Sequence, residues 1–295
     1  MALIISNESD HNWQAATKKR VEHIRVMVFI TVLIGSLLNS TFAQAEKSKV
    51  AIVIDDMGYR TTDTLAFDLP THVTFAILPH TEQSTRFAHR AQAQGRSLLL
   101  HLPMESLHPQ RLGPGALVAT MDASAITSVL DLALASVPHV TGVNNHMGSK
   151  LTQLTFPMTT LMKALADRNL YFIDSRTTRF TKARKIAAAF GLPVLERKVF
   201  LDHELNEHFI NQQFKRLVQL SRKYGHAIGI GHPHPLTLQS LSLLIELEKS
   251  VEFVSVDSLI QLQDQTDASH TQRHKGILPS QSTKLTTIEK GVAAN

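Results

Sequence analysis

Cysteine is absent from the 295 residues of this chain. Its absence excludes disulfide bonds, cysteine-ligated zinc, iron–sulfur clusters and a thiol nucleophile. A second long apolar run is also lacking, which excludes a membrane protein with several spanning helices. Histidine, in contrast, occurs 16 times. Without cysteine, imidazole and carboxylate groups are the side chains that remain for a tight transition-metal site.

Nucleotide-binding and serine-hydrolase motifs are missing as well. The sequence contains no Walker loop, no Gly-x-Gly-x-x-Gly turn and no Gly-x-Ser-x-Gly elbow. Its formal net charge of +5 is too weak and too dispersed to indicate a nucleic-acid-binding protein. We therefore expect neither a nucleotide nor a nucleic acid as a partner. The composition, with 43% hydrophobic and 19% charged residues, is that of a globular protein.

The N-terminus has the three parts of a secretory signal peptide. An apolar segment at residues 26–38 follows a basic segment that contains Lys18, Lys19, Arg20 and Arg25. Ala43 and Ala45 then form a small-x-small cleavage signal. The apolar segment is short for a membrane span of about 20 residues, which favours cleavage after Ala45 over retention as an anchor. We expect an exported, periplasmic protein that meets the membrane only through the signal peptide, residues 1–45, before cleavage.

Short apolar runs alternate with helical patterns along the rest of the chain. The apolar runs predict strands at 49–54, 73–78, 97–100, 140–143, 170–173, 194–201, 227–230 and 253–256. Helical patterns lie between them at 82–94, 123–136, 157–168, 181–190, 207–224 and 236–248. This alternation predicts an α/β fold with a parallel sheet, and seven or eight such units favour one irregular (β/α) barrel. Because periodicity ends near residue 264, we expect a catalytic domain at 46–263 and a disordered tail at 264–295.

Polar residues collect where the predicted strands end. In a parallel barrel all carboxyl ends of strands face one rim, where active sites are built. One polar residue at a strand end means little, because every strand has to leave the core. Six strand ends that carry such residues indicate a functional site; these residues are Asp55, Asp56, His101, Asn144, Asn145, His146, Asp174, Asp202, His203 and His232.

The pair Asp55 and Asp56 is the first of these groups. Two adjacent carboxylates repel each other unless a positive charge lies beside them. A divalent metal resolves this conflict, because one carboxylate can bind the metal while the other stays free as a base. The alternative is that both residues cap the N-terminus of a helix.

Other residue pairs in the sequence allow two interpretations each. His101 and Glu105 are four residues apart and could share a metal if the segment turned helically, but Pro103 argues against a regular helix. Otherwise His101 is a hydrogen-bonded core residue. Asp174 and Arg176 form either an internal ion pair or an oriented catalytic pair.

Two more histidines follow the seventh predicted strand. His232 and His234 each precede a proline, so both favour an extended conformation with side chains on opposite sides. At most one of them therefore faces the site, and we expect His234 to be the one at the surface.

Five segments, taken in order, resemble the motifs of the divergent polysaccharide deacetylase family, a distant branch of the NodB-type carbohydrate esterases. The resemblance covers residues 48–262, and its segments are 54–58, 100–105, 142–149, 174–178 and 231–235. It implies an irregular (β/α) barrel and a zinc-like divalent metal held by one Asp and two His. It also implies metal-assisted removal of acetyl groups from acetylated sugars.

The resemblance assigns roles to single residues. Asp55 matches the catalytic base, Asp56 the metal-binding aspartate, His101 the first metal-binding histidine, and His232 the histidine that protonates the leaving group. The second metal-binding histidine would fall at Glu105, which is a departure from the family pattern. The Arg-x-Pro-Tyr motif of the parent family is missing as well.

The third metal ligand is therefore either His146 or Glu105. We favour His146, because imidazole suits zinc better than a second anion and because His146 ends a strand of its own. His146 belongs to the segment that stands near the place of the missing motif. We expect four residues at the rim to contact the substrate: Asn144, Asn145, Asp174 and Arg176.

The sequence thus predicts a metal-dependent hydrolase, with zinc as the expected ion, that removes acetyl groups from an N- or O-acetylated cell-envelope polysaccharide. The alternative is a non-catalytic domain that keeps the fold and the metal and binds an envelope glycan or protein. The missing Arg-x-Pro-Tyr motif favours this alternative, whereas Asp55, Asp56 and His232 favour the enzyme.

Overall fold

A computed structural model describes residues 46–275 and six residues nearer the N-terminus, namely 18, 20, 22, 23, 25 and 27. The chain divides into two compact units, Met1–Glu46 and Lys47–Asn295. Apart from those six residues, the expected signal peptide lies outside the described residues. Among the described residues, no helix is both long and apolar enough to cross a membrane.

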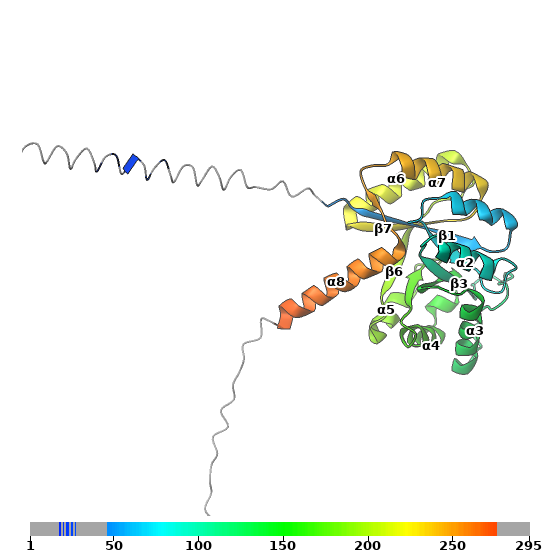
Figure 1. Cartoon of the computed structure of the whole chain (residues 1–295). Coiled ribbons are helices and arrows are strands. Elements are labelled where there is room, and N and C mark those ends of the chain that lie inside the picture. Colours follow the sequence, from blue (N-terminus) through cyan, green and yellow to red (C-terminus); the bar gives the residue numbers. More distant parts are fainter. Residues whose placement is uncertain are drawn as a thin grey trace, which may run out of the picture. The chain divides into compact units, whose positions relative to one another are not determined.

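Seven parallel strands in the second unit form a closed barrel (Figure 1). Hydrogen bonds join each strand to the next and the last, β7, back to β1. The strands are β1 (Lys49–Met57), β2 (Thr74–Ile77), β3 (Leu98–Met104), β4 (Gly142–Met147), β5 (Tyr171–Asp174), β6 (Val194–Phe200) and β7 (His226–Gly231). The short β8 (Glu252–Phe253) pairs with the first two residues of β1. The predicted (β/α) barrel is confirmed.

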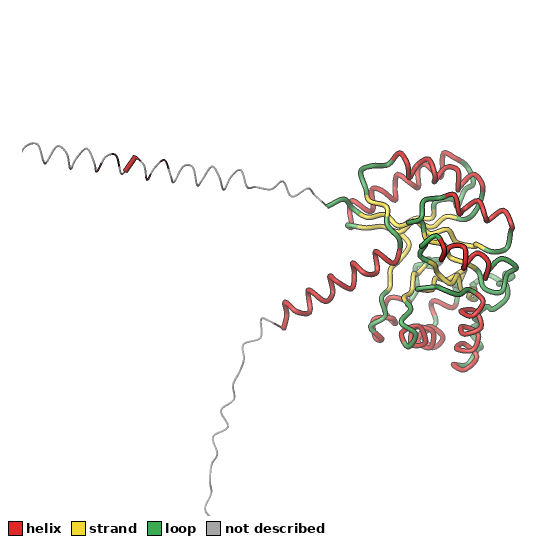
Figure 2. The backbone as a smooth tube through the Cα atoms, in the orientation of Figure 1, coloured by secondary structure: helices red, strands yellow, loops and turns green. Residues whose placement is uncertain are grey.

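Helices connect the strands on the outside of the barrel (Figure 2), and a last helix, α8, follows the final strand. They are η1 (Thr61–Asp68), α2 (Ser84–Ala93), α3 (Ala123–Ser136), η2 (Leu151–Gln153), α4 (Thr155–Ala166), α5 (Ala183–Ala187), η3 (Ala188–Phe190), α6 (Glu207–Tyr224), α7 (Pro235–Leu247) and α8 (Val256–Lys275). Asp122 and Asn206 accept hydrogen bonds from backbone N–H groups at the starts of α3 and α6. The barrel is irregular because a 3₁₀ helix follows β1 and α5 has only five residues.

The first turns of α8 close the amino end of the barrel. Val256, Leu259 and Ile260 are buried in the cluster of apolar side chains contributed by alternate residues of the strands. Asp257 accepts hydrogen bonds from Tyr171, the first residue of β5, and from Thr141, just before β4. The amino end is therefore packed and structural, which leaves the carboxyl end of the barrel for a site.

The predicted boundary of the tail falls inside α8. This helix continues to Lys275 and so includes residues 264–275 of the expected tail, whose disorder stays a prediction. Residues 264–275 contain neither glycine nor proline, so a helix already begun at Val256 meets no breaker there. The rest of the expected tail, 276–295, lies outside the described residues.

We predict that the seal formed by α8 contributes to stability. Leu259, with a relative exposure of 4%, is replaced by alanine, and Leu243 of α7, with 55%, serves as the matched control. Leu259→Ala should lower the free energy of unfolding by about 2–5 kcal/mol, because a buried methyl-rich side chain leaves a cavity. Leu243→Ala should change it by less than about 0.5 kcal/mol. Equal effects of the two substitutions in urea denaturation would show that α8 does not close the barrel.

Candidate metal centre

The strand ends that the sequence singled out meet at the carboxyl rim of the barrel. Asp55 and Asp56 lie at the end of β1, His101 in β3, His146 near the end of β4, and His232 directly after β7. In register, His101 pairs with Asn144, and His146 lies two residues further along β4. Barrel closure therefore brings residues separated by up to 177 positions in sequence to one place.

A bulge in β1 turns both carboxylates of the Asp pair toward the site. Successive side chains of a regular strand point to opposite faces. The register between β1 and β2 shifts between Ile54 and Met57, and Asp56 has a φ of 56°, in the left-handed region. Bulges re-aim side chains, and aspartate tolerates this conformation better than most residues. Asp55 and Asp56 can therefore both reach His101, at 3.7 Å and 3.0 Å from its Nε2.

Three side chains offer ligand atoms to one metal ion. The Asp56 carboxylate lies 3.0 Å from His101 Nε2 and 2.8 Å from His146 Nδ1, and the two ring nitrogens are 3.2 Å apart. Donors bound about 2.0–2.1 Å from a tetrahedral zinc ion lie about 3.3 Å from one another. The donor set of one carboxylate and two imidazoles and its spacing therefore fit a zinc-like ion, and this group, all within 4.8 Å, is the one found among the described residues.

Asn144 fixes the proton on the buried His101. Its side chain is fully buried, and its Nδ2 donates a 2.8 Å hydrogen bond to Asp55 Oδ1. Because an ionised carboxylate only accepts hydrogen bonds, the amide nitrogen must face Asp55, and the amide oxygen then faces His101 Nδ1 at 2.8 Å. His101 Nδ1 therefore carries a proton and donates a hydrogen bond to the amide oxygen of Asn144. When His101 is protonated at both nitrogens, Nε2 donates the 3.0 Å hydrogen bond to Asp56. When a metal binds, the same Nε2 would offer its lone pair to the ion.

Asp55 and Asp56 differ in their ionisation. Burial raises the pKa of Asp55 above its ordinary value, and the neighbouring His101 and His232 offset this only in part. Burial would also raise the pKa of Asp56, but its hydrogen bonds with His101 and His146 lower it below its usual range. Asp56 is thus held as an anion among the imidazoles, whereas Asp55 is the more basic of the two carboxylates.

His232 is oriented by a buried aspartate of the neighbouring strand end. Its Nδ1 donates a 2.9 Å hydrogen bond to Asp202 Oδ1, and its backbone N–H donates to Oδ2 of the same carboxylate at 2.7 Å. His232 Nε2 lies 4.0 Å from Asp56 Oδ2, at the border of the metal centre. Burial lowers the pKa of His232, but the hydrogen bond and charge of Asp202, together with Asp55 and Asp56, raise it to about 9.

A 260 Å³ cleft opens beside the metal centre. Asp56 and His232 line its inner end, and its other walls come from Tyr59, Arg60, Asp63, Pro233 and His234. The expectation that His234 lies at the surface, away from the site, is wrong, because this half-buried residue lines the cleft with its ring centroid 6.2 Å from that of His232. Although each of the two histidines precedes a proline, both line the cleft. The chain does not stay extended after His234, because α7 begins directly after it.

Glu105, the alternative third ligand, lies outside this group of donors. β3 runs as a strand through Pro103, so the helical turn that would bring His101 and Glu105 together does not form. Four residues of extended chain span about 13 Å. Glu105 instead accepts hydrogen bonds from Lys150 Nζ at 2.5 Å and from the Ala119 N–H at 2.7 Å. The geometry thus selects His146 over Glu105.

Asn144 and Asn145 are buried, and their hydrogen bonds hold neighbouring groups of the site in place. Asn144 bridges Asp55 and His101. Asn145 donates to the Met147 carbonyl at 2.7 Å and accepts from the Ser175 N–H at 2.9 Å. Since their polar atoms are already engaged inside the protein, the structure does not support the expectation that these two residues contact the substrate.

Asp174 and Arg176 form neither of the two expected pairs. Asp174 is buried and accepts hydrogen bonds from the Arg176 N–H and from Thr181 Oγ1, both at 2.8 Å. It therefore shapes the loop after β5 and is not exposed to a substrate. The Arg176 side chain forms an ion pair with Glu196 instead, at 3.1 Å, and remains 35% exposed.

Sequence reasoning missed two residues that hold the site together. Asp202 was noted at a strand end, but its partner His232 emerges only when β6 and β7 lie side by side. Arg197 donates hydrogen bonds to the carbonyl groups of Ser175 and Arg176, at 2.6 Å and 2.8 Å, and so braces the loop next to Asn144. An arginine inside a strand carries no pattern that indicates such a role.

The donor geometry predicts which substitutions remove a metal. After zinc loading and desalting, Asp56→Ala, His101→Ala and His146→Ala should each lose most of the bound ion, whereas Glu105→Gln should keep it. Elemental analysis by mass spectrometry measures the content, and circular dichroism checks that each variant is folded. If Glu105→Gln loses the metal and His146→Ala keeps it, the donor assignment is wrong.

Comparisons with known proteins find relatives of similar sequence. Protein YibQ of Escherichia coli K12, itself uncharacterized, is 40% identical over 223 residues, which cover 75% of this chain and 70% of YibQ. An uncharacterized protein of Haemophilus influenzae is 37% identical over 235 residues, or 79% of this chain and 82% of its own.

The fold also resembles a solved structure, that of an uncharacterized protein from Agrobacterium tumefaciens C58. The TM-score is 0.70 at 26% identity, and the match covers 74% of this chain and 91% of the other. The model of the divergent polysaccharide deacetylase family matches residues 52–260. The barrel, its rim residues and these matches together show that the chain belongs to the divergent polysaccharide deacetylase family.

Proposed function

We propose that this protein is a metal-dependent hydrolase that removes acetyl groups from a cell-envelope polysaccharide. The observation that carries the proposal is the placement of two proton-transfer groups at one metal centre. Asp55 borders the donor group at His101, and His232 borders it at Asp56. A structural metal site has no need of such groups, whereas hydrolysis of an amide needs both a base and an acid.

The chain's own residues have separate roles in the reaction. A divalent ion bound by Asp56, His101 and His146 would supply Lewis-acid activation of water and of the acetyl carbonyl. Asp55 accepts the proton of the attacking water as its oxygen bonds to the carbonyl carbon. His232, held through Nδ1 by Asp202, donates a proton from Nε2 as the bond from that carbon to the sugar nitrogen or oxygen breaks. Acetate and the free amine or hydroxyl leave.

The location and the substrate follow from different parts of the chain. The proposed signal peptide would export the mature protein, beginning at Glu46, to the periplasm, where envelope polysaccharides are found. The cleft beside Asp56 and His232 is open to solvent through the exposed Tyr59 and Arg60, as entry of a polymer requires. Family membership supports an acetylated polysaccharide as the substrate class.

The base is tested by a substitution that keeps its shape. Asp55→Asn should lower the rate of acetate release from acetylated chitin oligomers or peptidoglycan fragments at least about 100-fold, because the amide cannot accept the proton of water. Its metal content should equal that of the unmodified protein, since Asp55 is outside the donor group. Acetate release at an unchanged rate would remove Asp55 from the reaction.

The acid is tested through the leaving group. His232→Asn should slow hydrolysis of an N-acetylated sugar about 100-fold or more, because an amine has to be protonated to leave. The same variant should hydrolyse 4-nitrophenyl acetate within a few-fold of the unmodified rate, since nitrophenolate leaves without a proton. His203→Asn, an exposed neighbour of Asp202, is the control. Equal losses on both substrates would show that His232 is not the acid.

The missing Arg-x-Pro-Tyr motif favours a second candidate, a metal-containing domain that binds glycan without hydrolysing it. The two candidates differ in one result. Metal content near one ion per chain with no acetate released from any acetylated glycan would favour the binding domain.

A further inference from the structure

A strip of basic side chains lies on the segment that follows β5 and on the neighbouring β6. Five of its cations fall within residues 176–185, in the loop after β5 and in α5, and the sixth belongs to β6: Arg176, Arg179, Lys182, Arg184, Lys185 and Lys198. We propose that this basic strip binds acidic groups of the polysaccharide, so that the substrate is an anionic glycan. The inference rests on the proposed function for the identity of the ligand as a glycan.

The basic strip has few carboxylates to balance it. Glu196 lies near three of the cations, 3.1 Å from Arg176, 3.7 Å from Arg184 and 3.8 Å from Lys198. One carboxylate cannot neutralise three cations. The other acidic residue of the segment, Asp174, is buried and engaged by hydrogen bonds.

The remaining three cations form no ion pair with any residue that the structure describes. Arg179, Lys182 and Lys185 are all exposed, and Lys182 Nζ donates its hydrogen bond to the neutral Thr155 hydroxyl at 3.0 Å. A row of unneutralised cations creates a positive potential that attracts an anionic polymer. The net charge of +5 for the whole chain does not reveal this local excess of positive charge.

The loop that carries the basic strip begins at the metal centre. Ser175, directly before Arg176, receives a hydrogen bond from Asn144, which also holds Asp55 and His101. Thr177 Oγ1 donates to the carbonyl of Met147, next to His146 in β4. A polymer bound along the strip is thereby led to the reacting groups.

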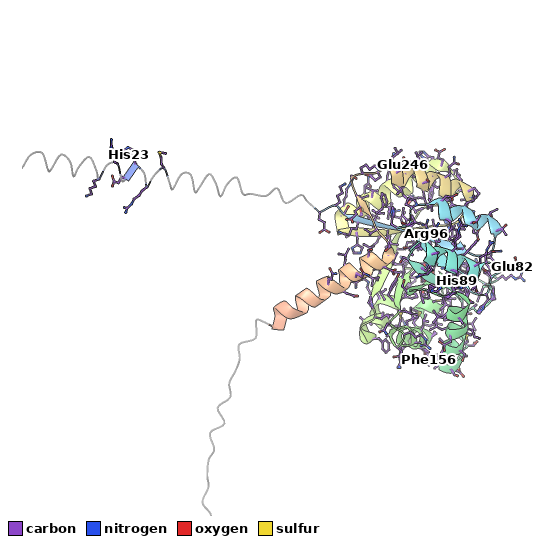
Figure 3. All side chains as sticks on the ribbon, viewed as in Figure 1. His23, Glu82, His89, Arg96, Phe156 and Glu246 are labelled. Atoms are coloured by element: carbon purple, nitrogen blue, oxygen red, sulfur yellow. The ribbon has the colours of Figure 1, made fainter. Side chains whose placement is uncertain are left out.

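Two exposed aromatic rings accompany the cations. Phe180 lies within the basic strip at 59% exposure, and Phe156 is 56% exposed. Phe156, labelled in Figure 3, lies in the first turn of α4. The Lys182–Thr155 hydrogen bond ties the start of α4 to the strip. An exposed aromatic ring offers a flat apolar face on which a sugar ring can pack. One face of Phe180 is covered by the Arg179 guanidinium, 4.6 Å from the ring centroid. The mixture of cations and aromatic rings suits an acidic sugar better than a neutral one.

Binding of two N-acetylated glycans that differ in charge tests the proposal. Hyaluronan oligosaccharides alternate N-acetylglucosamine with glucuronate, whereas chitin oligosaccharides of equal length contain N-acetylglucosamine alone. Calorimetry with the zinc-loaded, full-length Asp55→Asn protein measures affinity without turnover. We expect hyaluronan to bind more tightly than chitin at low salt and to lose this advantage as the salt concentration rises, because surface charges are screened.

A triple variant locates the binding surface. Arg179→Gln, Lys182→Gln and Lys185→Gln together should weaken hyaluronan binding about tenfold or more, by the sum of exposed charge contacts, and leave chitin binding unchanged. The matched control replaces three exposed cations elsewhere, with Arg86→Gln, Lys215→Gln and Lys223→Gln, and should have no such effect.

Three outcomes would overturn the proposal: equal affinity for the two glycans, equal losses in the two triple variants, or tighter binding of a DNA oligonucleotide than of hyaluronan through the same three residues. Because binding is measured without turnover, the test does not depend on acetate release. Absence of acetate release together with strip-dependent hyaluronan binding would refute the hydrolase and retain the basic strip as a glycan-binding surface.

Discussion

Two adjacent carboxylates at the end of β1 impose the main constraint on the rim of this barrel. The buried Asp55 and the partly exposed Asp56 repel each other unless their surroundings separate their roles. The imidazoles of His101 and His146 stabilise the charge on Asp56, and the amide of Asn144 holds Asp55. The bulge in β1 is what allows both carboxylates to reach these partners.

The same constraint connects the metal centre to the loops around it. The amide of Asn144 cannot rotate without losing its hydrogen bond to Asp55 or to His101. This one side chain therefore fixes both the orientation of the Asp55 carboxylate and the proton on His101 Nδ1. His232 is oriented in an equivalent way by the buried Asp202. A divalent ion would take the place of the proton on His101 Nε2 and bind the same carboxylate and imidazoles.

Much of the fold and of the site could be predicted from the sequence. The alternation of strands and helices predicts the barrel, and the rule that parallel strands end at one rim predicts that Asp55, Asp56, His101, His146 and His232 meet there. The parts of the site that could not be predicted depend on which strands are neighbours in the barrel and on their register. Pairing of His232 with Asp202 needs β6 beside β7, and burial of Asn144 and Asn145 needs the register between β3 and β4. The spacing of His101 and Glu105 fits a helix, but the chain there is extended, in keeping with Pro103.

The central claim is that one carboxylate and two imidazoles hold a single divalent ion. X-ray absorption spectroscopy of the zinc-loaded protein tests it directly. The account predicts a first coordination shell of light atoms at about 2.0–2.1 Å, with the multiple scattering of two imidazole rings. It predicts that Glu105→Gln keeps this shell, whereas His146→Ala loses most of the zinc. A shell with one imidazole in the unmodified protein, or no bound zinc, would contradict the account.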